Sequence, residues 1–192
     1  MNGQTMASGR GKASIVRILL WGAVAVLLAL PAVAMRFTDE VNWTASDFVF
    51  ATVLLGGTGL LLELTVRSSP SWSYRGGVVA ALAATFLLIW INGAVGIIGD
   101  EDNPQNGIYL AEILIALFGA LLARFRAPGM ALAMAAAGLT QAAIGLTALI
   151  AGWGANEPPG AFGVLMINGF FTVLWLISAA LFWNAARDQA GR

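Results

Sequence analysis

The chain has 192 residues, of which 59% are hydrophobic and 10% are charged, and its mean hydropathy is +0.81. Soluble domains carry about 25% charged residues, so this composition excludes an ordinary soluble globular protein and indicates an integral membrane protein. Ten basic residues balance ten acidic residues, which leaves no excess of positive charge for a nucleic-acid partner. Because the chain has no Cys and no His, it lacks a thiol nucleophile, the usual ligands of zinc and haem, and the His of a hydrolytic triad.

Six apolar segments are long enough to cross a bilayer as helices, which requires about 20 mostly apolar residues. They cover residues 15–34, 48–66, 78–98, 108–123, 130–151 and 162–183. We therefore predict an all-α, polytopic membrane helix bundle with six transmembrane helices in one domain over residues 15–186. Residues 1–14 are expected to form a disordered cytoplasmic tail and residues 187–192 a second cytoplasmic tail.

The first apolar segment has a second interpretation. Basic residues precede it, and Ala32-Val33-Ala34 follows Pro31, a pattern that also suits a cleavable signal peptide. The apolar run over 18–34 is longer than the core of about 7–15 residues found in signal peptides, which favours a retained span. Cleavage would leave five spans.

The loop after the first segment, residues 35–48, combines charged and aromatic residues in the sequence MRFTDEVNWTASDF. We predict an interfacial turn or short helix on the outer leaflet. Its polar and aromatic residues are Arg36, Asp39, Glu40, Asn42, Trp43 and Asp47. Thr44 or Ser46, together with Asp47, is expected to cap the second span, and Arg36 is expected to pair with Asp39 or Glu40.

Three segments carry a resemblance to a known family. They are FTDEVNW at 37–43, WIN at 90–92 and GIIGDEDNP at 96–104. The chain resembles an uncharacterised family of small bacterial inner-membrane proteins that carry the FTDEVNW segment after the first span, and the resemblance is best over the first four spans. It implies a bacterial inner-membrane location, and it implies no activity or catalytic residue.

The distribution of basic residues predicts the orientation, since cytoplasmic loops carry an excess of Lys and Arg. With the six spans placed as above, Arg36 is the one basic residue on the outer side. The others fall on the inner side: Arg10, Lys12, Arg17, Arg67, Arg75, Arg124, Arg126, Arg187 and Arg192. We predict a multi-pass protein of the inner membrane with both termini in the cytoplasm, and we expect Tyr109, at a span end, to lie at the outer interface.

Polar side chains inside the spans are the first candidates for function, because they are costly in lipid and tend to face the bundle interior. Glu63 precedes Arg67 by four residues near the inner end of the second span, which predicts a local ion pair. Glu112, Asn92 and Asn168 lie toward the outer ends of three spans, and Gln141 lies near the middle of a fourth.

If these four side chains converge, they form a pocket that binds a proton, a cation or a polar ligand head. The simpler interpretation, which the sequence favours, is that the amides form hydrogen bonds across helices and Glu112 reaches the outer headgroups.

Other chemistries do not fit the residue spacing. A calcium-binding EF-hand beginning at Asp100 would need Gly and Glu where the chain has Gln105 and Ala111. A retinal Schiff base needs a Lys in a span, and the only Lys is Lys12. We predict no metal ligands, no cofactor and no catalytic residues.

These patterns predict a non-enzymatic accessory or assembly component of a membrane complex. Its expected partners are the lipid bilayer and other membrane subunits or a second copy of the chain, and not nucleic acid. The alternative is a small transporter or a lipid- or quinone-binding protein that uses the polar residues around Glu112.

Overall fold

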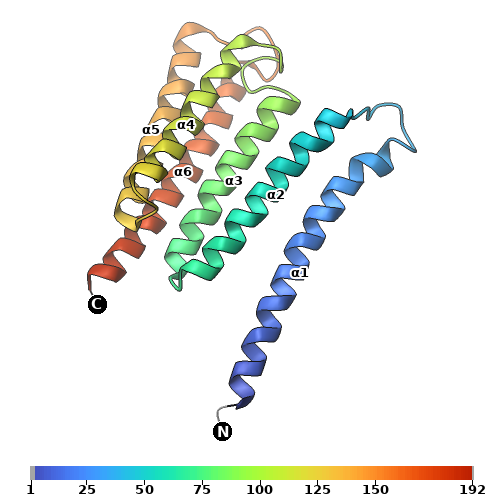
Figure 1. Ribbon diagram of the computed structural model, residues 1–192. Coiled ribbons are helices and arrows are strands. Elements are labelled where there is room, and N and C mark those ends of the chain that lie inside the picture. Colours follow the sequence, from blue (N-terminus) through green and yellow to red (C-terminus); the bar gives the residue numbers. More distant parts are fainter. Residues whose placement is uncertain (1–2, 192) are drawn as a thin grey trace. The chain divides into compact units, whose positions relative to one another are not determined.

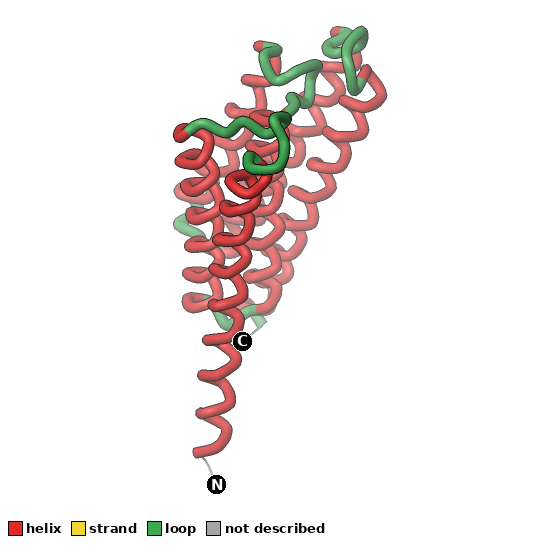
Figure 2. Tube along the Cα trace, turned by 90° about the vertical axis from the view of Figure 1, so that its right-hand side faces the viewer, coloured by secondary structure: helices red, strands yellow, loops and turns green. Residues whose placement is uncertain are grey.

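The computed structural model describes residues 3–191, with the backbone alone described for residues 3–14, 16 and 68. The fold is all-helical, with short loops between helices (Figures 1 and 2). The elements are α1 (Gly3–Ala34), α2 (Ala45–Ser68), α3 (Trp72–Ala94), the 3-10 helix η1 (Pro104–Gly107), α4 (Ile108–Leu122), α5 (Ala127–Ala151) and α6 (Gly160–Ala190). Six helical stretches are long and apolar enough to span a membrane, which confirms the predicted fold class.

Several boundaries differ from the prediction. α1 begins at Gly3 and α6 continues to Ala190, so residues 3–14 and 187–190, expected in cytoplasmic tails, are helical. Once a helix has formed in a span, each added residue gains a backbone hydrogen bond without a new nucleation cost. The third helix covers 72–94 rather than 78–98, because Ser71 caps its start by accepting from the backbone N–H of Tyr74.

The chain divides into two compact units. The first unit is Met1–Ser68 and the second is Ser69–Arg192. No residue of the span Arg17–Ala34 is buried.

The first unit pairs α1 with α2. At their contact a Cβ atom on Gly59 would lie 3.8 Å from Trp21 and from Val24. The loop between them forms a turn followed by irregular backbone and contains no helix. Thr44 precedes α2, and both its backbone N–H and its hydroxyl donate to Asp47, at 2.7 and 2.8 Å, so the Asp47 carboxylate satisfies the backbone N–H that precedes the helix.

Two ion pairs meet at Glu63 in this unit. Its carboxylate pairs with Arg67 one turn later, as predicted, and also with Arg17 of α1 at 2.9 Å. The Trp21 indole donates to the same carboxylate at 3.0 Å. Glu63 therefore links the two helices as well as neighbouring turns of one helix. In the described part of the chain, Arg36 forms no ion pair with Asp39 or Glu40.

The second unit is a four-helix bundle in which α6 packs against both α3 and α5, and α5 also packs against α4 (Figure 1). Small residues allow the closest approaches. A Cβ atom on Gly145 of α5 would lie 2.7 Å from the Cβ of Asn168 on α6. Between α3 and α6, the buried hydroxyl of Ser178 donates to the Gly77 carbonyl at 2.7 Å.

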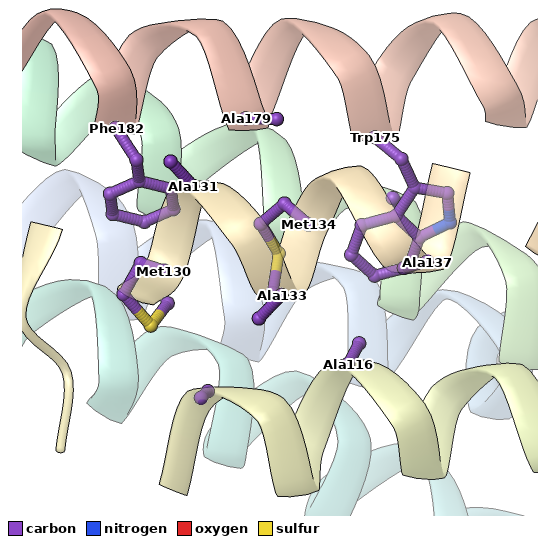
Figure 3. Close-up of a cluster of buried hydrophobic side chains, with 11 residues drawn as sticks. Ala116, Met130, Ala131, Ala133, Met134, Ala137, Trp175, Ala179 and Phe182 are labelled. Carbon is purple, nitrogen blue, oxygen red and sulfur yellow. The ribbon is translucent and has the colours of Figure 1, made fainter. Parts of the chain in front are cut away.

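Two apolar clusters fill this bundle. One contains Trp175 and Phe182, which extend from α6 over the Met and Ala side chains of α5, with Ala116 of α4 opposite (Figure 3). The other contains Ile97 and Ile98 of the α3–α4 loop together with Tyr109 and Phe171. We call the end of the bundle that holds the α3–α4 and α5–α6 loops the loop end. The basic-residue distribution predicts that it faces outward.

Candidate functional site

A group of polar side chains lies inside the second unit, in contact with both apolar clusters. It consists of Tyr109 and Glu112 of α4, Gln141 of α5 and Asn168 of α6, and we call it the polar layer. Tyr109, Glu112 and Ala116 follow one another at spacings of three and four residues, which places them on one face of α4. None of the four polar side chains is more than 1% exposed.

Asn168 is the centre of the hydrogen bonds in the polar layer. Its Nδ2 donates to the Val164 carbonyl at 2.8 Å and to the Tyr109 hydroxyl at 3.0 Å. Its Oδ1 accepts from Gln141 Nε2 at 2.7 Å. Because Val164 lies one turn before Asn168 on the same helix, the bond to its carbonyl determines which way the Asn168 amide faces.

Gln141 connects Asn168 to Glu112. The other end of its amide lies 2.5 and 2.7 Å from the two carboxyl oxygens of Glu112. The buried Nε1 of Trp175 lies beside the same carboxyl and makes no hydrogen bond of good geometry. The polar layer thus forms a continuous path from Glu112 through Gln141 and Asn168 to Tyr109.

The α3–α4 loop covers the polar layer at the loop end. Ile97 and Ile98 of this loop are fully buried beside Tyr109 and Val164. Asn106 holds their backbone, since its Oδ1 accepts from the N–H groups of both isoleucines, at 3.1 and 2.9 Å. Its Nδ2 donates to the Asp100 carbonyl at 2.7 Å.

Gly99 allows this loop to close. Its φ of +68° lies in the left-handed region, which favours glycine. A Cβ atom at this position would collide with the Glu157 carboxylate of the α5–α6 loop. The two loops are therefore in close contact above the polar layer.

No other carboxyl lies near Glu112 in the helices of this bundle. α5 contains no Asp, Glu, Lys or Arg, and the charged residues of α3 and α6 are Arg75, Arg187 and Asp188, at the ends of those helices away from the loop end. Among the described residues, no group of three or more acidic side chains could hold a metal ion.

The structure brings together three of the four side chains proposed from the sequence, which are Glu112, Gln141 and Asn168. Asn92 does not join them by a hydrogen bond. Its Nδ2 donates to the Leu88 carbonyl at 2.9 Å, and its Oδ1 is buried without a partner. Glu112 is fully buried and does not reach the headgroups.

Tyr109 is the member of the polar layer that the sequence analysis missed, because its position near a span end predicted an interfacial ring. It is 1% exposed, and its hydroxyl bonds to Asn168. Its spacing of three residues before Glu112 was the available signal. The remaining candidates, Arg36, Asp39, Glu40, Asn42, Trp43 and Asp47, lie in the first unit.

Comparison of the chain with protein-family models, curated proteins and solved structures gives no match. The resemblance based on FTDEVNW therefore stays a prediction.

Proposed function

We propose that this protein is a small ion-translocating membrane transporter and that the polar layer around Glu112 is its exchange site. The observation that carries the proposal is the convergence of Glu112, Gln141 and Asn168 from three helices with no exposed surface. A carboxyl inside a membrane bundle is costly and typically marks an ion or proton pathway. The setting we propose is the bacterial inner membrane, with both termini in the cytoplasm.

The arrangement of the polar layer supports exchange better than a purely structural role. Amides alone would satisfy one another across helices, and the Gln141–Asn168 bond already does this. Glu112 adds an ionisable group that this bond does not need. The apolar clusters in contact with the polar layer would help to separate it from water.

Transport by reconstituted protein tests this proposal. Vesicles that contain the purified chain and an internal pH dye are subjected to a proton gradient, and in separate trials to sodium and potassium gradients. We expect the unchanged protein to carry an ion flux across the vesicle membrane and the Glu112→Gln variant to carry none. The Glu101→Gln variant is the matched control, because Glu101 is an exposed loop residue, and it should retain the flux. Equal flux through empty vesicles and all three proteins would refute the proposal.

We propose as a second function an accessory role in a membrane complex, which α1 favours. The span Arg17–Ala34 has no buried residue, and Val26 within it is 60% exposed. Such a helix can pack against another membrane protein. A photo-crosslinking residue at position 26 should capture a discrete membrane protein in native membranes, whereas the same residue at Leu132, which is 70% exposed on α5, should not. Crosslinking to lipid alone at both positions would contradict this role.

A further inference from the structure

The hydrogen bonds of the polar layer depend on whether Glu112 carries a proton. When it does, the carboxyl O–H donates to Gln141 Oε1, and Gln141 Nε2 donates to Asn168 Oδ1 at 2.7 Å. Asn168 Nδ2 then donates to the Val164 carbonyl and the Tyr109 hydroxyl. In this orientation of the two amides, every donor in this chain of bonds meets an acceptor.

Ionised Glu112 cannot keep the same arrangement. A carboxylate only accepts hydrogen bonds, so Gln141 must turn its Nε2 toward Glu112, where it lies 2.5 and 2.7 Å from the two oxygens. The oxygen of Gln141 then faces Asn168 Oδ1 at 2.7 Å, and two acceptors at this distance repel each other. Asn168 must therefore turn as well.

Rotation of the Asn168 amide changes a hydrogen bond within α6. Once Asn168 has turned, its Nδ2 donates to Gln141, and its Oδ1 must move away from the Val164 carbonyl, because two acceptors repel each other at the 2.8 Å that separated Nδ2 from this carbonyl. The bond to the Val164 carbonyl is lost, while the Tyr109 hydroxyl can donate to the oxygen that now faces it. Trp175 Nε1, which has no partner in the observed arrangement, gains a carboxylate acceptor beside it.

A larger ligand does not fit this geometry. The polar atoms that join Glu112, Gln141, Asn168 and Tyr109 are 2.5–3.3 Å apart, which is direct hydrogen-bonding contact. Calcium and magnesium require about six or more oxygen ligands around the ion, and the polar layer has no space between its atoms for such a shell. A proton needs no added volume.

From these contacts we propose that the ligand of the polar layer is a proton, and that its loss from Glu112 reverses the Gln141 and Asn168 amides together. In this step the O–H bond of the Glu112 carboxyl breaks and the proton passes to water, with no change in oxidation state. The reversal passes the change in protonation of Glu112 on to the hydrogen bonds of Val164 and Tyr109, which lie beside the buried Ile97 and Ile98. The inference rests on Glu112 being the exchange site of the proposed transporter, and it makes Gln141 and Asn168 positioning residues.

Other ionisable groups do not produce this coupling. Besides Glu112, the polar layer has one titratable group, the Tyr109 hydroxyl. α5 has no charged residue, and α6 faces Glu112 with Asn168 and Trp175. The acidic residues of the loops that cover the polar layer are exposed; they are Asp100, Glu101, Asp102 and Glu157. The charged residues of α3 and α6 lie at the far ends of those helices. A titration shared by Glu112, Gln141 and Asn168 would thus report on one proton.

Nuclear magnetic resonance of the full chain in lipid nanodiscs tests the inference. The protein carries ¹³C at the Glu carboxyl carbons and ¹⁵N at the Gln and Asn side-chain amides. Signals are assigned by their loss in Glu112→Gln, Gln141→Leu and Asn168→Leu. We expect the signals of Glu112, Gln141 and Asn168 to shift with one common midpoint as the pH is varied.

The Glu112→Gln variant separates the relay from general pH effects. Its neutral amide can donate to Gln141 as the protonated carboxyl does, so the fold is kept and the amide signals of Gln141 and Asn168 should lose their pH-dependent shifts entirely. Asn92→Leu is the matched control, because Asn92 makes no hydrogen bond to the polar layer, and it should leave the common midpoint in place.

Two results would overturn the inference. One is titration of Glu112 while both amide signals stay unchanged. The other is a saturable shift of the Glu112 signal on adding sodium, potassium or magnesium at constant pH. Linked titration without vesicle flux would refute the proposed transport and keep the proton relay, whereas cation flux without linked titration would do the reverse.

Discussion

The close approach of α5 and α6 at Gly145 predicts a measurable loss of stability when a single methyl group is added. In Gly145→Ala the new Cβ would lie 2.7 Å from the Cβ of Asn168 and 3.2 Å from its Cγ. Non-bonded carbons pack at about 3.5–4.0 Å. The helices must therefore separate by about 1 Å, or Asn168 must move away from Gln141.

The magnitude follows from two opposing effects. Overpacking costs about 1–3 kcal/mol, whereas replacing Gly by Ala inside a helix gains about 0.5–1 kcal/mol. Gly169→Ala is the matched control, because nothing lies within 4 Å of its Cβ position and it makes the same gain. Gly145→Ala should thus be less stable than Gly169→Ala by about 1–3 kcal/mol, or about 5- to 150-fold in the unfolding equilibrium.

Reversible unfolding in mixed detergent micelles, followed by circular dichroism, measures this difference. Both variants and the unchanged chain are compared at the same detergent composition. Equal stability of the two alanine variants would show that α5 and α6 do not approach at Gly145 as described, and would remove the support for the Asn168 position.

Three further predictions address other parts of the chain. Since the chain has no Cys, the double variant Val24→Cys, Gly59→Cys should form a disulfide on mild oxidation. The control double variant Val24→Cys, Gly57→Cys should not, because nothing lies within 4 Å of a Cβ on Gly57. Equal crosslinking of the two double variants would contradict the α1–α2 contact. Asn106→Ala leaves the N–H groups of Ile97 and Ile98 without their acceptor, so their hydrogen exchange should accelerate about fivefold or more, while Gln105→Ala, at an exposed position, should leave it unchanged. Ser178→Ala removes the buried bond to the Gly77 carbonyl and should cost about 0.5–1.5 kcal/mol in the micelle unfolding assay, and an unchanged value would mean that this bond adds no net stability.

The sequence alone determined the helical class and the approximate positions of the spans, because hydrocarbon accepts only segments that satisfy their own backbone over a sufficient length. It also determined local contacts. The Glu63–Arg67 pair and the Thr44–Asp47 interaction depend on spacings of four and three residues, which any helix or helix start brings together.

The sequence predicted helix boundaries less well, because some apolar residues lie in loops. Ile97 and Ile98 read as the end of the third span because they are apolar, yet they lie in the loop that covers the polar layer. Hydropathy indicates that a segment prefers apolar surroundings to water, but it does not distinguish lipid from the interior of the protein. The hydrogen bonds from the backbone to Asn106 and the left-handed φ of Gly99 place Ile97 and Ile98 in the loop rather than in α3, and both features exist only in the folded loop.

Only the tertiary structure decided which polar side chains meet. Tyr109 and Asn168 are 59 residues apart, and Gln141 reaches Asn168 across 27 residues. Their contact depends on the rotation of α4, α5 and α6 about their own axes, which in turn depends on how closely small residues such as Gly145 let the helices approach. The amino-acid sequence shows which residues share a face of each helix, but which faces contact one another is decided by the packing of the helices in three dimensions.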